Sequence, residues 1–332
     1  MVETATAGDR ASPWGAWRGV AVAAAIATVA WFLSSHYGGP AMLFALLIGM
    51  AFHHLAARPR WRPGIDLSSS TILRVGVALL GLRLTFADVA QLGWLPVVGV
   101  AGLVLLTLGT GVLIARFTRM GLAYGLLSGG AVAICGASAA LAIASVLPKA
   151  RVREEDVLFT VVAVTALSTI AMVLYPVLFA AMGLEDIEVG YLIGASIHDV
   201  AQVVGAGYSV SETAGDIATF TKLLRVALLP VVLIVVALSF RADNGAKVGL
   251  PWFVVVFMAL MVLRNVVDLP PALLQAGDLA SRLMLLTAIA ALGVKTSLGA
   301  MAAAGPARLA GIVGSSLVLL CAALGYAHWV MV

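Results

Sequence analysis

Three polar side chains stand close together in one of the most apolar parts of the sequence. His198, Asp199 and Gln202 lie within the Gly-rich run 194–207, in a chain of which 62% is hydrophobic. A charged group at the centre of a bilayer costs about 2.5–3.5 kcal/mol on insertion scales, so such groups are usually functional. Glycines on both sides favour a turned or closely approached backbone. The run is therefore a candidate substrate or ion site inside a membrane protein, with a polar cluster that only joins helices as the alternative.

Two basic residues stand in another apolar segment. Lys222 and Arg225 are three positions apart, so they lie on one helix face. We expect Asp199 to pair with one of these cations, which leaves the other cation and Gln202 for a ligand, and the excess positive charge favours an anion. His198 and Asp199 are the predicted coupling residues. His198 is the candidate proton carrier because histidine changes its charge near physiological pH, and a hydrogen-bonded structural histidine is the alternative.

Membrane helices must position these residues. The mean hydropathy is +1.08 and only 11% of the residues are charged, whereas a soluble domain carries about 25%. Apolar runs of about 20 residues are long enough to cross a membrane as helices. We expect an all-α polytopic membrane protein with eleven hydrophobic segments, at approximately 19–35, 40–57, 71–86, 94–115, 122–147, 156–182, 189–210, 215–239, 250–267, 273–294 and 305–331.

The distribution of basic residues orients these segments, because cytoplasmic loops carry an excess of Lys and Arg. Basic residues precede the first segment and follow the second and fourth, namely Arg10, Arg18, Arg58, Arg60, Arg62, Arg74, Arg116 and Arg119. The loop 34–40 contains none and should lie outside. We therefore expect a cytoplasmic N-terminal tail over 1–18 and a single transmembrane domain over 19–332 in the bacterial inner membrane.

Segments 122–147 and 189–210 leave two topologies open. If both cross the membrane fully, the basic cluster 149–153 falls outside and the acidic cluster 185–188 falls inside, against the expected distribution. If both are re-entrant hairpins, each cluster falls on its preferred side, although the acidic residues 154–156 neutralise the basic cluster and weaken the argument. The fold prediction is therefore a bundle of nine to eleven transmembrane segments that includes two interrupted or re-entrant helices.

A longer repeat in the sequence indicates an inverted duplication. Residues 81–93 align without gaps with residues 293–305, matching Arg83 to Lys295 and closing each copy with a glycine. The two copies fall on opposite faces of the membrane, which is typical of secondary transporters. Chance similarity among Gly- and Ala-rich helices is the alternative. The predicted repeats cover about 40–182 and 189–331.

A shorter pair of Gly-Ala-Ser motifs stands in the middle of the two ambiguous segments. As tips of hairpins, these motifs would direct half-helix N-termini, with their free N–H groups and positive dipole ends, at an anion. Close helix packing through small residues is the alternative. The predicted substrate-binding residues are Cys135, Gly136, Ala137, Ser138, Gly194, Ser196, Gln202, Lys222 and Arg225, and the repeat-related basic positions are Arg83 and Lys295.

Five stretches together resemble the bacterial membrane family called sulfate exporters. They are Gly-Leu-Arg-Leu-Thr (81–85), Ala-Ile-Cys-Gly-Ala-Ser-Ala-Ala (133–140), Gly-Ala-Ser-Ile-His-Asp-Val-Ala-Gln-Val-Val-Gly-Ala (194–206), Thr-Lys-Leu-Leu-Arg (221–225) and Ala-Leu-Gly-Val-Lys-Thr (291–296). The resemblance covers the chain after residue 20. More distantly, the chain is similar to bile-acid/sodium symporters and cation/proton antiporters, which implies an inverted-repeat bundle with two crossing, interrupted helices.

The distant resemblance also bears on topology. In the symporters the element similar to 122–147 spans the membrane fully, which favours eleven spans. Here the second Gly-Ala-Ser motif follows the first too soon to be its copy in simple order, so the symporters' sodium sites are not carried over.

The expected function is secondary active transport of a small anion, of the sulfate or organosulfonate type, by alternating access with proton coupling. An anion or ion channel is the main alternative, and a sodium-coupled organic-anion symporter is less favoured. We expect no enzyme, because Cys135 and His198 complete no catalytic triad, and no metal or other cofactor. The expected partners are the small anion and membrane lipid, with a homodimer left open and nucleic acid excluded.

Overall fold

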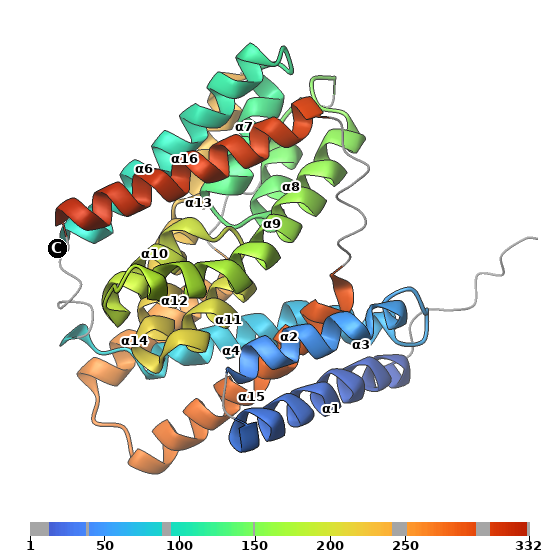
Figure 1. Cartoon of the computed structure of the whole chain (residues 1–332), viewed down its shortest axis with the longest axis vertical. Coiled ribbons are helices and arrows are strands. Elements are labelled where there is room, and N and C mark those ends of the chain that lie inside the picture. Colours follow the sequence, from blue (N-terminus) through green and yellow to red (C-terminus); the bar gives the residue numbers. More distant parts are fainter. Residues whose placement is uncertain are drawn as a thin grey trace, which may run out of the picture. The chain divides into compact units, whose positions relative to one another are not determined.

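The computed structural model describes residues 13–37, 40–87, 94–148, 150–240, 251–296 and 306–330, and every regular element among them is a helix (Figure 1). Seven helical stretches are long and apolar enough to cross a membrane. They are Ala16–Tyr37, Arg62–Leu82, Trp94–Phe117, Glu154–Ala181, Glu212–Ser239, Pro271–Lys295 and Arg308–Val330. The predicted all-α polytopic membrane protein is confirmed.

The chain forms two compact units, and each is described by itself. Unit 1 comprises residues 1–76 and 279–297, and unit 2 comprises residues 77–278 and 298–332. Unit 1 contains α1 (Pro13–Tyr37), α2 (Ala41–Ala51), η1 (His53–Leu55), α3 (Arg62–Leu67), η2 (Ser68–Ile72), the start of α4 (Leu73–Leu79) and most of α15 (Pro271–Lys295).

Helices of unit 1 approach one another through glycines. A β-carbon at Gly49 on α2 would lie 3.0 Å from the α-carbon of Gly293 on α15, so only glycine allows this spacing. The same helix α15 ends at Lys295, whose Nζ lies 2.8 Å from Asp66 Oδ1 on α3. Unit 1 therefore joins the second copy of the predicted repeat to the N-terminal helices.

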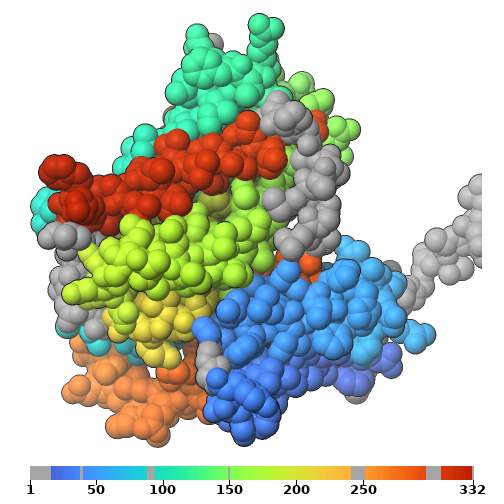
Figure 2. Space-filling view, viewed as in Figure 1, coloured from blue at the N-terminus to red at the C-terminus, as the bar shows by residue number. Residues whose placement is uncertain are grey.

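Unit 2 contains the remaining described elements. They are η3 (Leu80–Leu82), α6 (Trp94–Phe117), α7 (Leu122–Ala133), α8 (Ala137–Val146), α9 (Glu154–Ala181), α10 (Asp186–Ser196), α11 (Val200–Val210), α12 (Glu212–Ala227), α13 (Leu229–Ser239), α14 (Trp252–Val266) and α16 (Pro306–Val330). Helix α16 lies at the surface in Figure 2, and it exposes Leu317 and Trp329 while Leu319 and Ala323 are buried. An apolar exposed face is what lipid contact requires.

The helices α7 and α8 form a hairpin. A β-carbon at Gly130, near the end of α7, would clash with Cδ1 of Ile143 on α8. Thirteen residues of continuous helix would extend about 20 Å, so this contact requires α8 to fold back along α7. The first ambiguous segment therefore doubles back at its break.

The helices α10 and α11 form a second hairpin, which packs on α12. Along α10, Gly190 faces Ala214 and Gly194 faces Ala218, so α10 and α12 run in the same direction. Gly207, near the end of α11, instead faces the start of α12, with a β-carbon there 2.9 Å from the α-carbon of Gly215. Because α11 runs opposite to α12 and α10 runs with it, the second segment also reverses at its break.

Both segments thus double back at their breaks, as the hairpin alternative predicts, and their topology in the membrane stays a prediction. Some predicted boundaries also change. The segment predicted at 40–57 is helical as α2 only over Ala41–Ala51, and the segment predicted at 71–86 begins at Arg62. Residues 88–93 and 297–305, which complete the two copies of the longer repeat, lie outside the described residues.

Candidate functional site

The tips of the two hairpins touch each other inside unit 2. The first tip is 134–136, where Gly136 adopts the left-handed φ of 61° that favours glycine. The second tip is 197–199. A β-carbon at Gly136 would lie 3.7 Å from the β-carbons of both His198 and Asp199. Two helix breaks far apart in the sequence therefore meet at one point, called here the crossing (residues 134–136 and 197–199).

Arg225, which α12 carries into the crossing, is 1% exposed. It donates hydrogen bonds to the last carbonyls of α7, Val132 O at 2.7 Å and Ala133 O at 2.8 Å. It also donates to carbonyls at the end of α10, namely Gly194 O at 3.1 Å, Ala195 O at 2.8 Å and Ile197 O at 3.1 Å. The last carbonyls of a helix lack partners and carry its negative dipole end. One guanidinium thus satisfies the C-terminal ends of both half-helices.

Lys222 lies one turn earlier on α12 and is also fully buried. Its Nζ donates to the carbonyls of Ile134 and His198 and, at 2.9 Å, to Ile197 O. A lysine ammonium has three protons, and these three carbonyls match them. Lys222 and Arg225 therefore donate their hydrogen bonds to main-chain carbonyls at the helix breaks. A direct contact of either residue with a substrate stays a prediction, and so does an ion pair with Asp199.

The other ends of the half-helices also lie at the crossing. Helix α8 begins at Ala137, directly after Gly136, and helix α11 begins at Val200, directly after Asp199. The first N–H groups of each helix have no partner within the helix and form its positive dipole end. Two such ends side by side, with cations behind them, form an arrangement suited to an anion.

Hydroxyl groups of α9 hold the second tip. The backbone N–H of Asp199 donates to Ser168 Oγ at 2.8 Å. Gln202, in the first turn of α11, donates from Nε2 to Thr169 Oγ1 at 3.4 Å. Its Oε1 is buried and has no hydrogen-bond partner within the described part of the chain. A buried acceptor of this kind needs a hydrogen-bond donor, which an ordered water or a protonated ligand can supply.

His198 is 2% exposed and contacts α16. Its Nε2 lies 2.8 Å from Ser316 Oγ, and that hydroxyl donates its proton to Ile312 O at 2.7 Å. This contact connects the second tip to α16.

The structure corrects the predicted role of one Gly-Ala-Ser motif. Residues 136–138 begin α8 as expected, but residues 194–196 end α10, before its break. A β-carbon at Gly194 would lie 2.5 Å from Ala218 O, and Ser196 Oγ donates to Leu192 O at 2.5 Å. The N-terminal end at the second tip is instead supplied by the residues after Asp199.

The remaining predicted residues divide between the crossing and its surroundings. Cys135 is buried within the first tip as a free thiol, Ala137 is half-buried and Ser138 is exposed at the start of α8. The sequence prediction missed Ser168, Thr169 and Ser316. A hydroxyl in an apolar helix usually bonds its own helix, as Ser316 also does, so only their placement at the tips distinguishes these three. No group of three or more possible metal ligands occurs in the described residues.

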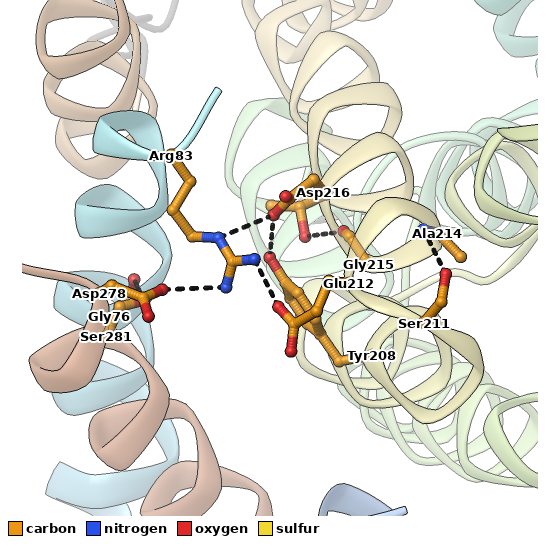
Figure 3. Close-up of polar contacts among 11 residues, drawn as sticks. Gly76, Arg83, Tyr208, Ser211, Glu212, Ala214, Gly215, Asp216, Asp278 and Ser281 are labelled. Carbon is orange, nitrogen blue, oxygen red and sulfur yellow. Dashed lines mark hydrogen bonds and ion pairs between the residues drawn. The ribbon is translucent and has the colours of Figure 1, made fainter. Parts of the chain in front are cut away.

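A second polar network lies around Arg83, which follows η3 and contacts residues at the start of α12 (Figure 3). The Arg83 guanidinium pairs with Glu212, with Asp216 at 3.4 Å and with Asp278 at 3.0 Å, and Tyr208 donates to Asp216. Burial lowers the pKa of Arg83, but its tyrosine and carboxylate neighbours raise it by more, so that pKa lies above its ordinary value. The repeat-related position Arg83 is therefore held in a network of three carboxylates.

The comparisons with known proteins give the family. The family model described as Conserved hypothetical protein 698 matches residues 18–311. The chain belongs to this family. It is similar to a UPF0324 membrane protein of Chlorobaculum tepidum, with 44% identity over 94% of this chain and 89% of the relative. It is also similar to the UPF0324 membrane protein TauZ of Paracoccus denitrificans, with 45% identity over 92% of each chain.

A UPF0324 membrane protein of Rhizobium meliloti is 43% identical over 91% of this chain and 89% of the relative. No solved structure matches the chain. These relatives are bacterial membrane proteins, and together with the seven apolar helices they support a bacterial multi-pass membrane protein. The predicted links to sulfate exporters and to the symporter superfamily stay predictions.

Proposed function

We propose that the protein is a secondary active transporter that moves a small anion of the sulfate or organosulfonate type by alternating access. The observation that carries the proposal is the crossing. There, Lys222 and Arg225 satisfy the C-terminal ends of α7 and α10, while the N-terminal ends of α8 and α11 start side by side. Discontinuous helices with N-termini directed at an anion are typical of secondary transporters.

The arrangement of the hairpins supports alternating access. One full-length helix, α9, separates them, so under this proposal they enter the membrane from opposite faces. Reciprocal contacts support an inverted repeat as well. Gly81 packs against Phe257 O on α14, and Gly293, its counterpart in the repeat, packs against Leu46 O on α2. In this pairing α2 corresponds to α14, and the helix that ends at η3 corresponds to α15.

The proposed ligand contacts come from the helix starts and not from the cations. A tetrahedral sulfur oxoanion accepts several hydrogen bonds, which the first N–H groups of α8 and the Ser138 hydroxyl can donate. Gln202 and the α9 hydroxyls line the other side, and the cations on α12 supply positive charge behind the breaks. Asp199 is the proposed proton-coupling residue of the same site, with His198 as the alternative.

We propose the bacterial inner membrane as the location, with the N-terminus in the cytoplasm. In this orientation the described basic residues Arg151 and Arg153, between the hairpin α7–α8 and α9, lie inside. The acidic residues Glu185, Asp186 and Glu188, at the start of the hairpin α10–α11, lie outside. The hairpins thus give each charge cluster its preferred side.

Transport by purified protein in liposomes tests the proposal. We expect saturable uptake of labelled sulfate or of a sulfonate, accelerated by unlabelled anion inside the vesicles and by a pH gradient. Counterflow requires a carrier that alternates between faces, so it separates a transporter from a channel. Conductance without counterflow would favour the channel, and no flux of any sulfur oxoanion would contradict the substrate class.

A further inference from the structure

The charged side chains at the crossing do not cancel. Among the described residues at the two tips and on the α12 face that meets them, Lys222 and Arg225 are positive and Asp199 is negative. The helix ends balance one another, because two carbonyl ends and two N–H ends meet at the same point. With each of these side chains in its ordinary charge state, the site therefore carries one net positive charge.

The helices packed around the tips add no further charge close by. Helix α9 presents Ser168 and Thr169, and its acidic residues stand at its start, about 18 Å earlier along the helix. Helix α16 presents Ser316, and its Arg308 lies about 12 Å earlier. The titratable groups that remain at the tips or beside Arg225 are Cys135, His198 and Tyr191.

We infer that the crossing accepts one net negative charge, so that a monoanion binds alone and a dianion binds together with one proton on Asp199. This inference rests on the proposed function, because it concerns the ligand of the same site. An uncompensated charge in a buried site is costly. A monoanion neutralises the site, whereas a dianion leaves one excess negative charge that a proton must balance.

Position makes Asp199 the group that takes this proton. Asp199 is the N-cap of α11, and its β-carbon lies 3.7 Å from a β-carbon placed on Gly136, which precedes the start of α8. An anion bound at the start of α8 therefore lies beside the Asp199 carboxylate. Protonation of Asp199 strengthens binding of a dianion, and binding of a dianion favours protonation of Asp199 by the same factor, because coupling between two ligands is reciprocal.

His198 is the competing proton site, and the geometry disfavours it. A proton on His198 adds a third positive charge next to Lys222 and Arg225, which donate to the His198 carbonyl and to the Ile197 carbonyl before it. A proton on Asp199 instead removes a negative charge where the anion binds. Variants of the two residues distinguish these sites.

Calorimetric titration of the purified full-length protein tests the inference, with sulfate as dianion and methanesulfonate as monoanion. Each anion is titrated in buffers of different ionisation enthalpy at several pH values, which gives the number of protons taken up. We expect about one proton per sulfate and none per methanesulfonate. The sulfate affinity should rise up to about tenfold for each unit that the pH falls, while the methanesulfonate affinity stays constant.

The variants assign the proton. Asp199→Asn should bind sulfate without proton uptake and with an affinity that does not depend on pH. Asp186→Asn, an exposed acid at the start of the same hairpin, should behave as the wild type, and His198→Gln should still take up one proton per sulfate. Loss of proton uptake in His198→Gln, or its persistence in Asp199→Asn, would overturn the inference.

The wild-type measurement keeps the inference testable even if a variant does not fold. Equal proton uptake with sulfate and with methanesulfonate would contradict it. If the wild type binds both anions but takes up no proton with sulfate, the inference fails and the proposed transporter of anions stands. If the wild type binds neither anion, the proposed function fails with it.

Discussion

The two hairpins reverse direction inside the same unit with different chemistry at their tips. The first tip is apolar and depends on the left-handed φ of Gly136. The second tip uses ordinary extended backbone, with φ −70° and ψ 140° at Ile197 and φ −99° and ψ 146° at Asp199, and it carries His198 and Asp199. The first tip thus contributes main-chain donors, and the second contributes groups that can exchange a proton.

One helix serves both hairpins. Arg225 bonds the last carbonyls of α7 and of α10, and Lys222 bonds the carbonyls of both tips. Cations therefore satisfy the C-terminal carbonyls of both α7 and α10. The N-terminal ends of α8 and α11 differ, because α11 begins after Asp199 and α8 begins after Gly136. Under the proposed function, this difference assigns anion contacts to the first hairpin and proton coupling to the second, and each of the following experiments tests part of this comparison.

Removal of Arg225 should have the largest effect, since both hairpins depend on it. Arg225→Ala leaves buried carbonyls of two helix ends without donors, and we expect a loss of about 3–5 kcal/mol in the free energy of unfolding. Arg225→Lys should be intermediate, because it keeps the charge but not the planar fork. The measurement is thermal unfolding in detergent with Arg116→Ala, an exposed arginine on α6, as control. Equal stability of Arg225→Ala and Arg116→Ala would show that the two hairpins do not depend on Arg225.

The outer network should show that the two repeat-related basic positions are unequal. Arg83→Ala removes hydrogen bonds to several carboxylates from a side chain that is 15% exposed, and we expect a loss of about 1.5–3 kcal/mol. Lys295→Ala removes a pair with Asp66 in which both side chains are more than 40% exposed, so the expected loss is about 0–1 kcal/mol. Equal losses in unfolding measurements would mean that the Arg83 network contributes no more than an exposed pair.

Substitution of Gly136 tests the first tip alone. Gly136→Ala should cost about 1–3 kcal/mol, because φ 61° with ψ −123° is a backbone conformation that residues with a β-carbon rarely adopt. Its matched control is Gly183→Ala, which has φ 71° and nothing within 4 Å of the added carbon. Both variants should lose stability, but only Gly136→Ala should weaken anion binding at the start of α8. Unchanged anion affinity in Gly136→Ala would show that the first tip does not take part in anion binding.

Thiol labelling tests whether the hairpins enter from opposite faces, and it perturbs the protein least. In a Cys321→Ser background, which removes the exposed native thiol, Arg151→Cys should react with an impermeant reagent only from the cytoplasmic side. Asp186→Cys should react only from the other side. Modification of both from one side would contradict the opposed hairpins, while the contacts inside each hairpin would still hold.

Much of the fold follows from the sequence. The apolar runs predict helices because a backbone in lipid must satisfy its own hydrogen bonds. Charges in the loops favoured hairpins over full spans, although periodicity cannot show which way a chain turns after a break. That direction depends on contacts such as Gly130 with Ile143 and Gly207 with Gly215, which join positions with no mutual signal in the sequence.

Residue types alone determined that Lys222, Arg225, His198, Asp199 and Gln202 belong to a buried polar region, because charge in an apolar segment needs partners wherever it lies. Only the tertiary structure decided what those partners are. Lys222 and Arg225 bond main-chain carbonyls, which every residue has and no residue type marks. For the same reason the motif 194–196 ends a helix while 136–138 begins one, since the position of each break is set by the groups that satisfy it.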